Sequence, residues 1–291
     1  MKPRRHADLA DLVRTACTHA SNLDREMPLL AFEVQDHTLG WLRPSFADAL
    51  KRWPHWFAFG PDRVRFCATP DTVEGRTAAL AEVTRALAAE GLVHGWREET
   101  VAVSHHYAAP AMLHVERAAT RAFGFVAYGA HLTGFTRRGG ETHLWIARRS
   151  ATKSVDPDRL DNLVGGRVAS GFTVEETIRK EAWEEAGLPP AMLAGVPCAG
   201  ALRVEYTVPE GLHREILFVH DLWLPEDFTP RNTDGEVAAH YCLSIAHTIE
   251  ALLAGEFTPD AGTVTVDALL RQGVVKPEDP QYLELVRLTK P

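Results

Sequence analysis

The stretch GGRVASGFTVEETIRKEAWEEAGL, from Gly165 to Leu188, decides the fold of this chain. Thr173 and Glu176 have the spacing of a capping box, in which each side chain binds the other residue's backbone N–H at the start of a helix. Gly187 is a typical residue just beyond a helix end, because glycine adopts the left-handed conformation without strain. The pattern therefore predicts a helix over Val174–Ala186, directly after a double-glycine turn.

Three glutamates share one face of this helix. Glu181, Glu184 and Glu185 stand at positions i, i+3 and i+4, so they fall within an arc of about 100°. Carboxylates crowded in this way repel one another, and a hard cation such as Mg²⁺ or Mn²⁺ relieves the repulsion through oxygen ligands. Such an ion also binds diphosphate oxygens and activates water. Taken alone, an acidic helix face is more often simply solvated, so the surrounding residues decide the interpretation.

The segment resembles the Nudix box, Gx5Ex7REUxEExGU, in which U is an aliphatic residue. Gly166 stands at its first glycine and Glu181 at the glutamate of RE. Glu184 and Glu185 form the EE pair, and Gly187 stands at the last glycine. Several specified residue types at fixed spacing, between a strand and a helix, make this resemblance specific.

The resemblance implies an α+β fold, the Nudix α/β/α sandwich with a mixed sheet. It also implies hydrolysis of a diphosphate linkage by attack of water at phosphorus. Glu181, Glu184 and Glu185 are then the expected catalytic residues and metal ligands, with Mg²⁺ or Mn²⁺ as the cofactor. Glu181 and Glu236 are the alternatives for the general base, because members of the family take it from different places.

Two positions depart from the box. Phe172 stands where the family has its first glutamate, and Lys180 where it has the arginine. A lysine keeps the charge but lacks the planar fork that binds a carboxylate with two hydrogen bonds. Lys180 is therefore either a catalytic-site residue that orients Glu181 or a solvated helix charge. A domain that binds a ligand without cutting it stays an alternative, although three retained carboxylates that repel one another argue for an enzyme.

Residues around the box are candidates for substrate binding. Gly165 and Gly166 would let the backbone approach a phosphate closely, unless they form a plain tight turn. Arg148, Arg149 and Lys153 carry charges that suit a phosphate, although charges on loops usually face water.

Resemblance to one branch of the family extends over nearly the whole chain. It is carried by GWLRP (Gly40–Pro44), by Glu116–Phe135, by Leu144–Gly166 and by DGEV (Asp234–Val237). This branch has an N-terminal DUF4743 domain and is related to the Nudix portion fused to thiamine pyrophosphokinase in some fungi. The resemblance implies a damaged thiamine diphosphate as substrate, such as oxo- or oxythiamine diphosphate, converted to the monophosphate. ADP-ribose or another nucleoside diphosphate derivative stays open, because the box binds the diphosphate and other loops bind the rest.

A change of composition near residue 118 indicates two domains. We expect a smaller α+β domain over 1–118, with its clearest helix at Thr72–Glu90, and the Nudix domain over 119–291. The N-terminal domain is expected to close one side of the substrate pocket, since pockets favour domain interfaces. Further expected elements are helices over Ala7–Ala20 and Pro44–Trp53 and strands over Phe123–Phe135, His143–Arg148, Leu202–Val208 and Glu215–Leu224.

Charge and composition exclude several classes of protein. The 31 basic and 39 acidic residues give a net charge of −8, so no nucleic-acid partner is expected. The N-terminus lacks the apolar segment of a secretory signal, and no apolar run approaches the ~20 residues of a membrane span. The four cysteines lie far apart and suggest neither a disulfide framework nor a zinc site. We therefore expect a cytoplasmic enzyme that binds a small-molecule diphosphate and no membrane, and the resemblance adds the expectation of a homodimer.

Overall fold

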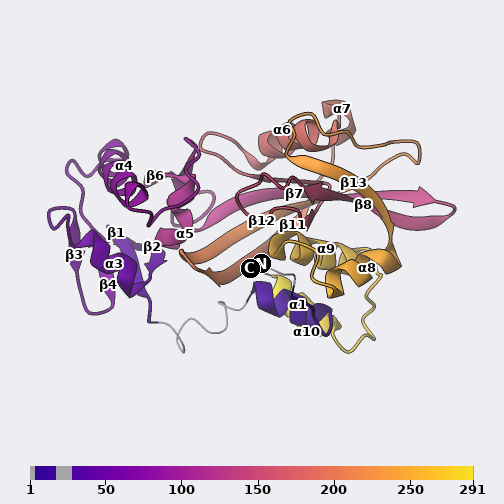
Figure 1. Cartoon of the computed structure of the whole chain (residues 1–291), viewed down its shortest axis with the longest axis horizontal. Helices are drawn as coiled ribbons and strands as arrows, with labels where there is room; N and C mark the ends of the chain where they lie inside the picture. The colour runs from indigo at the N-terminus through magenta and orange to yellow at the C-terminus, as the bar shows by residue number, and fades with distance from the viewer. Residues whose placement is uncertain (1–3, 18–27, 291) are drawn as a thin grey trace.

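The computed structural model describes residues 4–17 and 28–290, which form an α+β structure with a small and a large mixed sheet (Figure 1). The small sheet lies in the N-terminal half, at one end of the molecule, and the large sheet occupies the rest. The fold class predicted from the sequence is therefore confirmed, with the smaller domain ahead of the larger one.

The N-terminal domain is built on a four-stranded sheet and two main helices. Its elements are β1 (Leu30–Val34), β2 (His37–Leu42), α3 (Pro44–Leu50), β3 (Phe57–Phe59), β4 (Arg63–Phe66), α4 (Val73–Ala89), β5 (Thr100–Val103) and β6 (Leu113–Glu116). The sheet order is β2-β1-β4-β3, with β1 parallel to β4 and the other pairs antiparallel. Phe32 lies fully buried at its core, with its ring centroid 5.3 Å from that of Phe123.

The large sheet carries the strand that precedes the predicted helix. Its elements are β7 (Ala127–Arg138), β8 (Glu141–Arg149), β9 (Leu160–Asp161), β10 (Val164–Arg167), β11 (Cys198–Val208), β12 (Gly211–Trp223) and β13 (Val237–Ser244). The main order is β11-β12-β7-β8-β13, while β10 pairs with β7 and β9 pairs with β8. The sheet is mixed because β12 runs parallel to β7, whereas the other pairs are antiparallel.

Helices cover both faces of this sheet and make three layers (Figure 1). On one face lie α6 (Val174–Ala186) and α7 (Pro190–Leu193); on the other lie α1 (Leu9–Ala16), α8 (Ile245–Leu253), α9 (Pro259–Arg271) and α10 (Tyr282–Thr289). Successive residues of a strand point to opposite faces. Leu144 and Ile146 accordingly lie in the core beneath α9, whereas Trp145 lies in the core beneath α6. The expected α/β/α sandwich is confirmed.

The first described helix belongs to the core of the large sheet. Leu12 and Val13 of α1 are buried in the same cluster as Val264 and Leu269 of α9. The helix is also tied to the end of the chain, because the Ala10 N–H donates to the Gln281 side chain at 3.1 Å. The domain limits 1–118 and 119–291 stay a prediction.

A short helical link joins the two sheets and corrects one predicted boundary. It consists of η1 (Arg117–Ala119) and α5 (Thr120–Phe123), and Gly124, with φ of 60°, ends it. The strand predicted from Phe123 therefore starts only at Ala127, since Phe123 faces the core of the N-terminal domain.

Two predicted helices are longer than the observed ones. The helix expected over Pro44–Trp53 ends at Leu50, after which the chain turns towards β3. The helix expected over Ala7–Ala20 is observed at Leu9–Ala16, and its predicted last residues, 18–20, lie outside the described residues.

Candidate active site

Helix α6 begins and ends as the sequence predicts. The Thr173 hydroxyl accepts a hydrogen bond from the Glu176 N–H at 3.1 Å, and the Glu176 carboxylate accepts one from the Thr173 N–H at 2.8 Å. Gly187 follows with φ of 64°. Ile178 and Ala182 are buried against the sheet. Because that packing fixes the rotation of the helix, it also fixes the direction of the glutamate face.

Glu185 is the most deeply buried of the three glutamates, with 6% of the residue exposed. Its Oε2 atom accepts a hydrogen bond from the Gly165 N–H at 2.8 Å. Burial raises the pKa of Glu185 to about 8, and the neighbouring Asp161 carboxylate adds to the rise. Because burial disfavours the ionised form of this carboxylate, a bound cation would stabilise that form.

Glu181 packs directly against Gly166. A Cβ atom at position 166 would stand 2.2 Å from Cγ of Glu181, so no other residue fits there without moving the glutamate. Gly165 and Gly166 do not form the turn expected from the sequence. They lie in β10, paired with His131 and Ala130 of β7, because two residues without side chains let the strand run close beneath α6.

Lys180 bridges the two more exposed glutamates. Its Nζ atom donates to Oε1 of Glu181 at 3.2 Å and to Oε2 of Glu184 at 2.6 Å. Burial raises the pKa of Glu181, while Lys180 acts to lower it. Lys180 therefore contacts Glu181, and its role in orienting that glutamate stays a prediction.

The loop before β13 brings Glu236 to the same region. The Thr233 N–H donates to the carbonyl of Glu184 at 2.7 Å, which holds this loop against the end of α6. Glu236 forms an ion pair with Lys153. Burial lowers the pKa of the Lys153 ammonium, whose side chain is 15% exposed.

These residues line one cleft with two chambers. The acidic chamber, of about 400 Å³, is lined by Glu181, Glu184, Glu236 and Asp234, with Phe172 and Lys180 beside them. The second chamber, of about 430 Å³, extends towards β12 and α9. The chambers share their lining, since both are bordered by Arg97, Arg117, Arg149, Lys153, Gly165, Gly166, Arg167 and Glu236.

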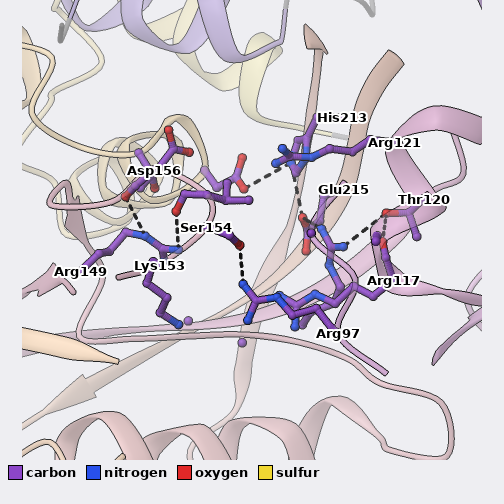
Figure 2. A pocket seen from close by; sticks show the side chains of 18 of the residues that line it. Arg97, Arg117, Thr120, Arg121, Arg149, Lys153, Ser154, Asp156, His213 and Glu215 are labelled. Atoms are coloured by element: carbon purple, nitrogen blue, oxygen red, sulfur yellow. Dashed lines mark hydrogen bonds and ion pairs between the residues drawn. The ribbon is translucent and has the colours of Figure 1, made fainter. Parts of the chain in front are cut away.

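The shared wall is strongly basic and is drawn from both domains. Figure 2 shows Arg97, Arg149 and Lys153 approaching one another from different segments, with Ser154 between them. Arg97 donates to the Ser154 hydroxyl at 2.6 Å, and Arg149 donates to Asp161 at 2.7 Å. This concentration of cations across from the glutamates suits a ligand with several anionic oxygens.

The structure separates one predicted residue from the rest. Arg148 does not line the cleft; it donates to the Asp158 carbonyl at 2.9 Å and to the Tyr241 hydroxyl at 3.2 Å. Its neighbour Arg149 points into the cleft instead, because alternate residues of β8 face opposite sides. The other predicted site residues lie together: Glu181, Glu184, Lys180, Glu236, Gly165, Gly166 and Lys153 line the cleft, and Glu185 contacts Gly165 at its edge.

Sequence reasoning missed two of the cations that line the cleft, both of which precede β7 in the chain. Arg97 and Arg117 lie far from the box in sequence and match no motif, so no sequence signal pointed to them. Asp161 carried a weak signal, since it is a carboxylate just before the double glycine.

The three glutamates of α6 offer the oxygen ligands that hard cations prefer. They are crowded enough that burial and mutual repulsion raise the pKa of Glu181 and Glu185. Their oxygens do not all converge, because Lys180 draws Glu181 and Glu184 towards itself while Glu185 turns to Gly165. The donor set fits a divalent metal.

No described helix has both the length and the apolar character needed to cross a membrane.

Two family models match consecutive parts of this chain. The family model "Domain of unknown function (DUF4743)" matches residues 9–127, and the model "NUDIX domain" matches residues 128–266. Nudix hydrolase 24, chloroplastic, from Arabidopsis thaliana is 32% identical over 288 residues, which cover 98% of this chain and 79% of that protein. Nudix hydrolase 20, chloroplastic, from the same plant is 33% identical, covering 88% of this chain and 71% of that protein.

Among solved structures, DR0079 from Deinococcus radiodurans matches with 26% identity and a TM-score of 0.36, covering 48% of this chain and 82% of that one. The two plant relatives match over most of their own length as well as most of this chain. The chain has a glutamate-bearing helix set against a cation-lined cleft, and it carries a DUF4743 domain ahead of its Nudix domain. It belongs to the Nudix hydrolases, enzymes that act on pyrophosphate bonds.

Proposed function

We propose that this protein hydrolyses the diphosphate linkage of a small organic diphosphate, with Glu181, Glu184 and Glu185 as ligands of Mg²⁺ or Mn²⁺. The observation that supports it is the single cleft in which the glutamate face of α6 meets a wall of cations. A diphosphate fits this arrangement, because its oxygens can bind a metal on one side and arginine or lysine on the other.

The metal, when bound, would neutralise charge that develops on the phosphate oxygens and lower the pKa of a bound water. The chain's own residues perform the remaining tasks. Lys153 and Arg149 bind phosphate oxygens, and Lys180 orients Glu181. Glu236 is a candidate general base, since it lines both chambers, and Glu181 is the alternative.

We propose a damaged thiamine diphosphate, such as oxo- or oxythiamine diphosphate, as the substrate, with the monophosphate as product. This choice rests on the resemblance to the DUF4743 branch related to the Nudix portion joined to thiamine pyrophosphokinase. The second chamber, of about 430 Å³, has room for the organic part of such a molecule. ADP-ribose is the alternative substrate.

The N-terminal domain would then complete the pocket. Arg97 and Arg117, which line both chambers, lie within the stretch matched by the DUF4743 model. Domain limits near residue 118, a cytoplasmic location and a homodimer remain proposals from the sequence and the resemblance.

The test is release of monophosphate or phosphate, with Mg²⁺, from thiamine diphosphate, its oxo and oxy analogues, ADP-ribose and nucleoside triphosphates. The variant Glu185→Gln removes the buried carboxylate, and Glu175→Gln is the matched control, because Glu175 lies exposed on the same helix and pairs with Arg179. Turnover of the analogues that Glu185→Gln abolishes and Glu175→Gln retains would support the proposal.

Turnover of ADP-ribose alone would keep the mechanism and discard the thiamine substrate. If no compound is turned over while Mg²⁺ still binds, the protein would be a ligand-binding module and not an enzyme.

A further inference from the structure

A second group of metal-ligating side chains lies at the far end of the cleft. His213 and Glu215 are two residues apart on β12 and therefore point to the same side of the strand. Asp260 joins them from the first turn of α9. One ligand atom from each of the three lies within 4.8 Å of the others, a convergence that the glutamates of α6 do not reach in the described part of the chain.

The distances within this group are unusual for hydrogen bonds. Nε2 of His213 lies 3.4 Å from Oε2 of Glu215 and 3.3 Å from Oδ2 of Asp260. A charged N–H donor normally approaches a carboxylate to about 2.7–2.9 Å. His213 is only 2% exposed, yet within residues 4–17 and 28–290 its Nε2 atom has no hydrogen-bond partner, nor does Oδ1 of Asp260. Buried polar atoms are rarely left in this state.

The same distances agree with coordination of a metal. Ligands about 2.1 Å from a tetrahedral ion lie about 3.4 Å from one another. One imidazole with two carboxylates suits a borderline cation such as Zn²⁺, and it differs from the all-oxygen set on α6. All three residues line the second chamber, so a fourth position would face the cleft.

A neighbouring cation favours the ionised form of Glu215. Burial acts to raise the pKa of Glu215, but the Arg167 guanidinium acts to lower it, and the net shift is downward. Arg167 donates to Oε2 of Glu215 at 3.1 Å and orients it.

We propose that His213, Glu215 and Asp260 bind a divalent ion of the zinc class at a site separate from the glutamates of α6. The ion has three protein ligands, and its open position faces the chamber expected to hold the organic part of the substrate. This site does not depend on the hydrolytic function, because none of its three ligands belongs to the Nudix box.

The test is titration of the full-length, chelator-treated protein with Co²⁺, which replaces Zn²⁺ and absorbs visible light intensely when its coordination is tetrahedral. The wild type should show this absorption, and Zn²⁺ should displace it. His213→Ala should weaken Co²⁺ binding at least about tenfold, as loss of one of three ligands implies. Glu185→Gln should leave the absorption in place, and so should His220→Ala, which removes another buried histidine of β12.

Absence of the absorption from the wild type would overturn the proposal. So would its loss in Glu185→Gln together with retention in His213→Ala, since the ion would then lie on α6. If His213→Ala does not fold, Asp260→Asn takes its place, because that side chain is 22% exposed and its replacement is nearly isosteric. Retention of full Co²⁺ affinity by Asp260→Asn would contradict the site, and a tenfold loss would support it.

Discussion

Gly166 and Glu181 are in contact so close that a Cβ on the glycine would stand 2.2 Å from Cγ of the glutamate and 2.6 Å from Cδ. The backbone of Gly166 does not require a left-handed conformation, since it lies in strand β10. Glycine is therefore needed at position 166 because Glu181 occupies the space that a side chain would fill. A substitution of Gly166 is expected to disturb the site and to leave the fold in place.

Gly166→Ala should lower kcat/KM about a hundredfold, because it displaces a ligand group by the order of an ångström. The melting temperature should change little, since the neighbour that must move is a flexible side chain. The matched control is Gly60→Ala, where the atom nearest to the added Cβ is Cγ of the Arg63 side chain, at 3.2 Å. Unchanged kinetics in Gly166→Ala would show that Glu181 does not take part in catalysis.

Lys180→Met should reduce kcat/KM about ten- to a hundredfold, with a shift of the Mg²⁺ dependence to higher concentration. The lysine donates to Glu181 and Glu184, and residues that orient metal ligands contribute on this scale. Lys180→Arg should restore the activity, because arginine keeps the charge and can reach both carboxylates. An unaltered Mg²⁺ dependence in the methionine variant would assign Lys180 to the solvated surface.

Arg97→Met should raise KM about tenfold while kcat changes less, because a charged hydrogen bond to an anionic substrate contributes about 1.5–3 kcal/mol when formed. Increasing salt should reduce the difference between the variant and the wild type. Arg52→Met, which removes another exposed arginine of the N-terminal domain paired with Glu90, is the control. Equal KM values in the two variants would contradict a role of the N-terminal domain in substrate binding.

Glu185→Gln should stabilise the metal-free protein at alkaline pH. The folded-state pKa of Glu185 is about 8, raised first by burial, whereas its ordinary value is 4.5. Its contribution to stability is therefore fully present below about pH 4.5 and is lost as the pH rises towards about 8. Melting temperatures in chelator should agree for the two proteins in acid and diverge over this range. A difference that is constant with pH would contradict the raised pKa.

The sequence predicted what depends on local spacing. The limits of α6 are those expected, because the capping box at Thr173 and the glycine at 187 act within a few residues. The helix at Thr72–Glu90 was found for the same reason, since Thr72 caps it and α4 spans Val73–Ala89. Helix α10 was not expected, because its short apolar stripe gains its partners from distant parts of the chain, chiefly α1 and α9.

The sequence failed where tertiary contacts decide. Gly165 and Gly166 have the composition of a turn, yet pairing with β7 places them in a strand. Arg148 and Arg149 are adjacent arginines that the sequence does not distinguish. Arg149 lies in the cleft and Arg148 outside it because successive residues of β8 point to opposite faces of the sheet. Arg97 could not be inferred, since its approach to Ser154 depends on how the two domains meet.

The position of α1 has a consequence for how the protein is made. Its residues leave the ribosome well before its partners in α9 and α10 are synthesised. At about 5–20 residues per second, the order of ten seconds or more must pass before these partners exist. The core of the N-terminal domain can assemble during synthesis, but the large core is completed only when α1 meets α9 and α10. Cutting away residues 1–118 would therefore remove part of both cores.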